Sequence, residues 1–163
     1  MSAPTSQPLI PDEFPVPGEL VHPEFRLRML AATDADADYE AVMASQDRLR
    51  AGSPHGWPRK GFTLAENLED LQRHEQEFHD RIAFAYTMVN PEDTRVLGCV
   101  YINPPRAGAD HDAEVYMWVR DEHHPELTRA LFEAVEAWLS REWPFDTIQY
   151  IRTDYFLPRE QDG

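Results

Sequence analysis

The chain has 163 residues, of which 42% are apolar, and this size and composition predict one folded domain with a core of its own. Its formal net charge of -15 excludes nucleic acid and anionic membranes as partners over most of the surface. The same charge favours a cationic substrate, unless the acidity serves only solubility. No run approaches the ~20 apolar residues of a membrane-spanning helix, and no basic patch precedes an apolar stretch at the N-terminus, so we expect a cytoplasmic protein.

The first segment of the chain is rich in proline, with six prolines in 24 residues. Because proline fixes φ and removes a backbone donor, this segment predicts an extended arm rather than a helix or a central strand. Leu20 and Val21 would attach the end of the arm to the core. We therefore divide the chain into an arm (1–24), a folded domain (25–151) and a short polar tail (152–163).

Alternating apolar and polar residues from 25 to 30 predict a half-buried strand. Asp34 then has the position of a helix N-cap, and the helix that follows should end near Gly52. The next segment, 53–61, is rich in proline and glycine and predicts a loop. Its tryptophan, Trp57, is either a lid over a pocket or a plug that closes the edge of the core.

The segment 64–79 carries the strongest helix signal. Thr63 and Glu66 form a T-x-x-E capping box, and apolar residues recur on one helical face. These apolar residues are Leu64, Leu68, Leu71 and Phe78. His74 and His79 belong to the polar side, and because their spacing suits a single metal ion poorly, we expect a solvated face there.

Segments 82–89 and 96–102 predict two strands, and the turn-forming residues between them indicate a hairpin. The second of these strands is apolar on both faces, so we expect it at the centre of the sheet, with Cys99 as a buried core thiol. The pattern ends with three further elements, which are a strand at 113–120, a helix from Pro125 and a strand at 147–151.

The order of these elements resembles the GNAT superfamily of N-acetyltransferases, as do short stretches of sequence such as HPEFRLRML, RVLGCVYI and AEVYMWVR. The resemblance implies an α/β fold with a mixed sheet of five to six strands. In this fold an antiparallel meander is followed by a crossover helix and a parallel fifth strand, with helices on both faces. It also implies transfer of an acetyl group from acetyl-CoA to an amine, here a small and cationic one.

In that family the fourth strand separates from the fifth, and the opening between them holds the cofactor. The resemblance therefore assigns the thioester carbonyl and the pantetheine arm to the backbone around Trp118 and Val119. It assigns the pyrophosphate to the loop and helix start that follow, with Arg120, His123, His124, Thr128 and Arg129. Glu114 would be the general base and Tyr155 the acid that protonates the leaving thiolate. The alternative for Glu114 is an ordinary carboxylate that points outward. The alternative for Tyr155 is an aromatic ring that packs on the core.

The pyrophosphate loop departs from the family pattern. It runs from Arg120 to Glu126 without a glycine, and it would place Asp121 and Glu122 beside the anion. This motivates a second hypothesis, a catalytically inactive module that binds a small ligand or a partner without CoA. The short C-terminus leaves one edge of the sheet open, which favours a homodimer. The histidines at the two ends of strand 113–120 lie too far apart to share one metal ion, so we expect no metal site.

Overall fold

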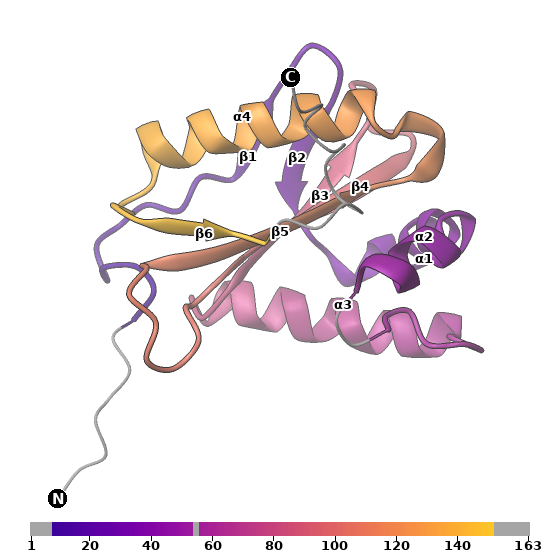
Figure 1. The fold of residues 1–163 in the computed structure, drawn as a ribbon, viewed down its shortest axis with the longest axis horizontal. Coiled ribbons are helices and arrows are strands. Elements are labelled where there is room, and N and C mark those ends of the chain that lie inside the picture. Colours follow the sequence, from indigo (N-terminus) through magenta and orange to yellow (C-terminus); the bar gives the residue numbers. More distant parts are fainter. Residues whose placement is uncertain (1–7, 54–55, 152–163) are drawn as a thin grey trace, which may run out of the picture.

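The computed structural model describes residues 8–53 and 56–151, which form one mixed sheet between two helical layers (Figure 1). The sheet contains six strands that lie in chain order, which are β1 (Glu19–Val21), β2 (Arg26–Met29), β3 (Phe84–Val89), β4 (Val96–Asn103), β5 (Ala113–Val119) and β6 (Ile148–Tyr150). Neighbouring strands are antiparallel except β5 and β6, which are parallel. This confirms the predicted meander followed by a parallel last strand.

Helices cover both faces of the sheet, as predicted. One face carries the three helices α1 (Ala35–Ala44), α2 (Gln46–Gly52) and α3 (Leu64–His79), whereas α4 (Glu126–Glu142) crosses the other face from β5 to β6 (Figure 1). Because side chains alternate along a strand, β5 contributes Met117 to the core under α4 and Trp118 to the core under α1 and α3. None of the helices in the described part of the chain has the length and apolarity that crossing a bilayer requires.

The central position of β4 is also confirmed. Its residues are buried from Val96 to Val100, and burial raises the pKa of the Cys99 thiol well above its usual range, so this thiol is a core group. Gly98 lies directly against β5. A Cβ atom there would come within 2.1 Å of the Trp118 carbonyl oxygen, so glycine is required for the two strands to approach this closely.

The N-terminal arm packs against the sheet over most of its described length. Ile10 is buried in the core, and the Tyr86 hydroxyl donates to the Pro17 carbonyl at 2.6 Å. The arm then supplies β1, in which Leu20 pairs with Leu27 of β2. The expected contact of Leu20 with the core is therefore one of several contacts along the arm. Residues 1–7 lie outside the described part of the chain.

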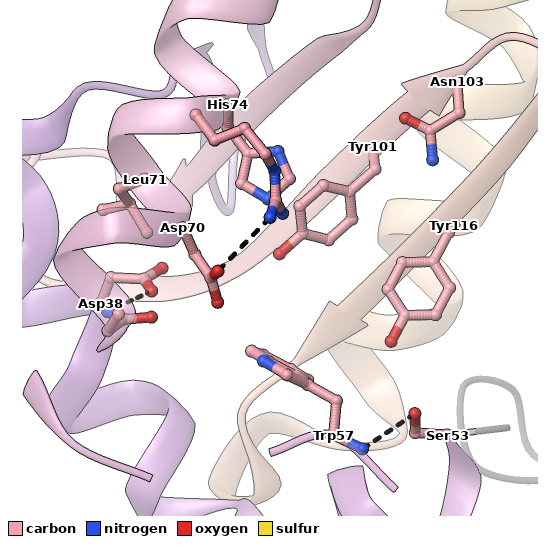
Figure 2. Close-up of a pocket in the computed structure, with 11 residues that line it drawn as sticks. Asp38, Ser53, Trp57, Asp70, Leu71, His74, Tyr101, Asn103 and Tyr116 are labelled. Carbon is pink, nitrogen blue, oxygen red and sulfur yellow. Dashed lines mark hydrogen bonds and ion pairs between the residues drawn. The ribbon is translucent and has the colours of Figure 1, made fainter. Parts of the chain in front are cut away.

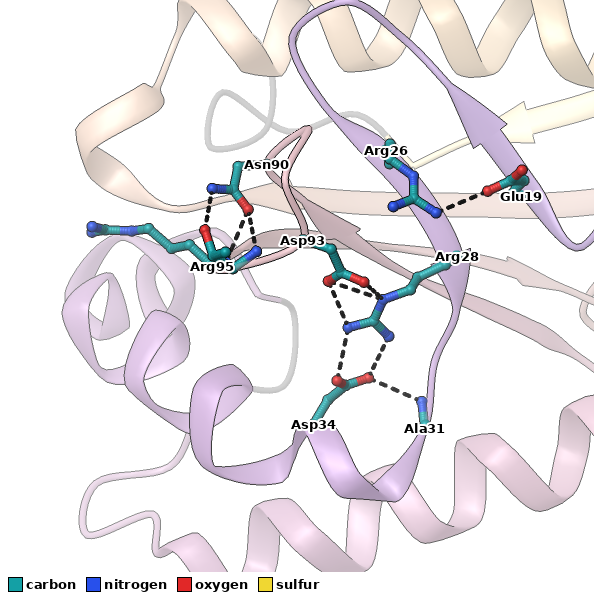
Figure 3. Close-up of polar contacts among 9 residues, drawn as sticks. Glu19, Arg26, Arg28, Ala31, Asp34, Asn90, Asp93 and Arg95 are labelled. Carbon is teal, nitrogen blue, oxygen red and sulfur yellow. Dashed lines mark hydrogen bonds and ion pairs between the residues drawn. The ribbon is translucent and has the colours of Figure 1, made fainter.

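Arg28 of β2 connects the nearby segment before α1 to the β3–β4 turn, which is distant in sequence (Figure 3). Its guanidinium donates to Asp34, before α1, at 2.8 Å and to Asp93, in the β3–β4 turn, at 3.0 Å. Asp34 also accepts from the backbone N–H of Ala31 at 3.2 Å and makes no side-chain cap on α1. Asp34 has the predicted N-cap position of α1, but its carboxylate forms no bond to that helix, because it pairs with Arg28 and accepts from Ala31 at the start of η1 (Ala32–Asp34) instead.

α3 has the predicted bounds and the predicted cap, in which the Thr63 hydroxyl accepts from the Glu66 N–H at 3.2 Å. Its orientation differs from the prediction, since Leu64 and Leu68 are 42% and 37% exposed. The buried face instead contains Asn67, which is 1% exposed. Half of the predicted apolar stripe is thus wrong, because a hydrogen-bonded polar side chain occupies the position that a leucine was expected to fill.

The helix predicted to end near Gly52 does so, but it is divided in two at Ser45. Ser45 is buried, and its hydroxyl accepts from the backbone N–H of Asp121 at 2.8 Å. The break therefore connects the first helical layer to the short 3-10 turn η2 (Asp121–His123), which follows β5.

Candidate functional site

A cavity of about 500 Å³ lies between α3 and the strands β4 and β5, on the sheet face opposite α4 (Figure 2). Its walls come from α1, α3, β4, β5 and the loop after α2. The lining residues that carry the argument below are Asp38, Trp57, Asp70, His74, Tyr101 and Tyr116. They combine carboxylates with aromatic rings.

Two carboxylates of this cavity differ in burial, since Asp38 is buried and the Asp70 side chain is 31% exposed. Asp38 is 4% exposed and accepts one hydrogen bond from the Asn67 amide at 2.9 Å. Burial raises the pKa of Asp38 to about 6. Burial also raises the pKa of Asp70, and its nearest cation is the Arg73 guanidinium at 3.6 Å. At neutral pH the cavity therefore holds negative charge that a cationic ligand would stabilise.

Aromatic rings face these carboxylates across the cavity (Figure 2). The rings of Tyr101 and Tyr116 lie 5.3 Å apart, and the Trp118 indole donates to the Tyr101 hydroxyl at 3.3 Å. Burial raises the pKa of Tyr116 to about 12, so its hydroxyl stays neutral. An ammonium group between aromatic faces and a carboxylate gains both cation–π and Coulomb attraction.

His74 points into the same cavity from α3 (Figure 2). Its side chain is only 21% exposed, and its ring lies 5.2 Å from that of Tyr101. Burial, with a smaller effect from Arg73, lowers the pKa of His74 to about 4, so the imidazole is neutral at physiological pH. The prediction of a solvated face at His74 is therefore wrong.

Among the described residues, the pairing of β5 with β6 ends near the point where the cavity meets β5. β6 pairs with β5 from Ala113 to Val115 only, and the last bond joins the Ile151 N–H to the Val115 carbonyl at 2.8 Å. Because backbone groups alternate along a strand, those of Met117 and Val119 point the same way as those of Val115. Within residues 8–53 and 56–151 no strand pairs with them on that side.

The loop after β5 is closed by its own ion pairs. The Arg120 side chain is 3% exposed and binds both Glu40 oxygens at 2.8 Å. Asp121 pairs with Arg48, which also donates to the Val119 carbonyl, and Glu122 pairs with Arg95 and Arg120. The backbone N–H groups of the same loop bind within the protein as well, since those of residues 121, 123 and 124 donate to Ser45, Arg120 and Asp121.

The remaining residues of the predicted cofactor site lie around the start of α4. Thr128 is buried, and its hydroxyl lies 2.8 Å from Nδ1 of His124. His123 is half-buried, and Arg129 is exposed to solvent. Trp118 is fully buried. The structure thus brings these residues together at one end of β5, and their assignment to a cofactor stays a prediction.

Glu114, the predicted general base, lies at the other end of β5. It is bound by Arg106 at 2.9 Å and by His111 at 2.8 Å, and these partners, Arg106 first, lower its pKa to about 2. So low a pKa makes Glu114 a weak proton acceptor, and its catalytic role stays a prediction. Tyr155 lies outside the described residues. In the part of the chain that the structure describes, no three His, Cys, Asp or Glu side chains gather as a metal site would require.

No family model and no curated protein sequence matches this chain. Solved structures do match it. RimL, the ribosomal L7/L12 alpha-N-protein acetyltransferase, in complex with coenzyme A, aligns with a TM-score of 0.60 and 17% identity over 75% of this chain and 67% of its own. The GNAT fold is shown by these matches.

Two further matches share this GNAT fold. One is the ribosomal-protein-S5-alanine acetyltransferase of Vibrio fischeri, with a TM-score of 0.58 and 16% identity over 75% of this chain and 67% of its own. The other is the microcin C7 self-immunity acetyltransferase MccE with acetyl-CoA and AMP, with a TM-score of 0.57 and 15% identity over 72% of this chain and 63% of its own. The chain thus spans about two thirds of the length of these GNAT proteins.

Proposed function

We propose that this chain is an N-acetyltransferase that moves an acetyl group from acetyl-CoA to a cationic primary amine held in the cavity described above. The observation that carries the proposal is the placement of two carboxylates, the buried Asp38 and the half-buried Asp70, opposite aromatic rings. This cavity reaches β5 at Tyr116, one residue beyond the last pairing with β6. The acetyltransferase fold of the matched structures supports the same reaction class.

Backbone groups rather than loop side chains are the donors that fit a CoA cofactor here. The Val119 carbonyl is bound by Arg48, so the groups that suit an extended amide-containing arm are those of Met117 and the Val119 N–H, which no described strand pairs on that side. The first N–H groups of α4, from Glu126 onward, have no partner within the helix, and Arg129 is exposed beside them. When bound, acetyl-CoA would supply the acetyl group as an activated thioester.

Amine transfer also needs a proton acceptor, because an ammonium has no lone pair with which to attack. Asp70 is better suited to this role than Glu114, since burial raises its pKa while that of Glu114 is lowered to about 2. Asp70 would first bind the ammonium and then hold one of its protons. The reactive nitrogen would lie between Asp70 and the open edge of β5.

Calorimetry with CoA and acetyl-CoA at low salt, followed by acetyl transfer to a panel of primary amines, tests the proposal. We expect micromolar cofactor binding and amine-dependent release of free thiol. Asp70→Asn should lower kcat/KM about 10- to 100-fold, in the range of a lost general base. Glu133→Gln, an exposed carboxylate on α4, is the matched control and should leave kcat/KM unchanged. No thiol release with any amine, despite cofactor binding, would refute the reaction.

The inactive ligand-binding module stays a second candidate, favoured by the ion pairs of the loop after β5. Arg120 and Arg48 are already neutralised by Glu40 and Asp121, so neither side chain is free for a phosphate. In that case the cavity would bind an amine while calorimetry detects no heat from CoA at millimolar concentration. Amine binding without cofactor binding therefore separates the two candidates.

A further inference from the structure

A second cavity lies beside the first and shares two wall residues with it. It has a volume of about 360 Å³, and its lining residues are Gly56, Trp57, Arg59, Phe62, Glu66, Glu69 and Asp70. Of these, only Trp57 and Asp70 also line the first cavity. The two cavities are therefore neighbours, and these two side chains form the partition between them.

Hydrogen-bond and ring contacts hold Trp57 in place. Its backbone N–H donates to the Ser53 hydroxyl at 3.1 Å (Figure 2). Its ring lies 6.0 Å from that of Phe62 and 6.4 Å from that of Trp118. Trp57 is thus neither a free lid nor a buried plug. It is a wall with a cavity on each side.

The chain that follows Trp57 is anchored as well. The carbonyl of Pro58 accepts from Arg50 of α2 at 2.7 Å, and the carbonyl of Phe62 accepts from the Tyr39 hydroxyl of α1 at 2.8 Å. These bonds hold the segment against both helices. The wall therefore keeps its position without a ligand.

The second cavity is acidic. It contains the carboxylates of Glu66, Glu69 and Asp70 and a single cation, Arg59, which pairs with Glu66 at 2.9 Å. The second ammonium group of a diamine would be stabilised there, just as an ammonium group beside Asp70 would be stabilised in the first cavity. The ring of Trp57 lines both cavities.

We propose that Trp57 is a specificity-determining residue that restricts the amine to one cationic group by closing the first cavity toward the acidic second one. The inference rests on the proposed function only in taking the first cavity as the amine site. An amine bound at Asp70 can extend along the first cavity, but a diamine cannot reach Glu69 past the indole. Removing the ring joins the cavities and opens that route.

Calorimetric titration without acetyl-CoA tests this, with a linear monoamine and the α,ω-diamine of the same chain length. The unmodified protein should bind the monoamine at least as tightly as the diamine. Trp57→Ala should bind the diamine about tenfold tighter than the monoamine, because one further charged contact forms. Trp57→Phe keeps a ring in the wall and should retain the preference of the unmodified protein.

The double variant Trp57→Ala/Glu69→Gln tests the additional charged contact of the diamine, and it should lose the tighter diamine binding of Trp57→Ala. Thermal unfolding checks that each variant is folded. An equal diamine-to-monoamine ratio in Trp57→Ala and the unmodified protein would overturn the inference, as would the absence of amine binding in every variant. Because no acetyl transfer is measured, an inactive enzyme with the expected binding ratios would refute the proposed reaction and leave this inference standing.

Discussion

The acidic loop after β5 and the acidic cavity beside Tyr116 of β5 differ in how their carboxylates are paired. In the loop after β5, Asp121 and Glu122 each face an arginine, and the buried Arg120 has carboxylate partners of its own. In the cavity, Asp38 has one amide partner, and Asp70 has an arginine no nearer than 3.6 Å. The loop therefore pairs its carboxylates more closely with arginines than the cavity does. The proposed preference for a cationic amine rests on this difference.

The largest effect on stability should come from breaking the loop at its buried cation. Arg120→Ala removes two bonds to Glu40 and the packing of a side chain that is only 3% exposed, so we expect a loss of about 2–4 kcal/mol in the free energy of unfolding. Chemical denaturation measures it, with the exposed Arg129→Ala as a control that changes less than about 0.5 kcal/mol. Equal losses for both variants would show that the Arg120 network is not structural.

Removing a charge from the cavity should instead raise the free energy of unfolding. The pKa of Asp38 is raised to about 6 in the folded protein, so folding favours its protonated form and the stability that this supplies is lost as pH rises from about 4 to about 6. Asp38→Asn keeps an acceptor for Asn67 and should stabilise the protein by about 1–3 kcal/mol near pH 8, but not near pH 4. Denaturation at both pH values measures this. A pH-independent difference would contradict the account of Asp38.

The smallest effect should come from the exposed carboxylates of the loop. Asp121→Asn removes an ion pair with Arg48 in which the aspartate is 47% exposed, so we expect a loss below about 1 kcal/mol that shrinks further in high salt. Chemical denaturation at low and high salt measures this change. A loss that equals that of Arg120→Ala would show that the surface pair, and not the buried arginine, holds the loop.

Local sequence signals predicted most of the fold. The capping box at Thr63 and Glu66 located the start of α3, and the run of apolar residues in β4 located the centre of the sheet. The order of the elements then predicted the parallel pairing of β5 with β6. These features depend on residues close to one another in sequence or on the order of elements, which a sequence shows directly.

The candidate site could not be predicted in the same way. Burial of Asp38 depends on α1 packing against Asn67 of α3, and the pairing of Arg120 with Glu40 joins residues 80 positions apart. One signal was present, since Asn67, Asp70 and His74 share a helical face with the buried Leu71. Because His74 was assigned to a solvated polar face, the cavity beneath that face was not predicted from the sequence.

The central claim is that the cavity recognises a positive charge, and the most direct test compares a primary amine with the alcohol of the same carbon skeleton. Calorimetric titration near pH 8 should detect the amine and not the alcohol, because Asp70 and Asp38 are then ionised. Asp70→Asn should weaken amine binding at least about tenfold. Equal binding of amine and alcohol, or an amine affinity unchanged by Asp70→Asn, would contradict the claim.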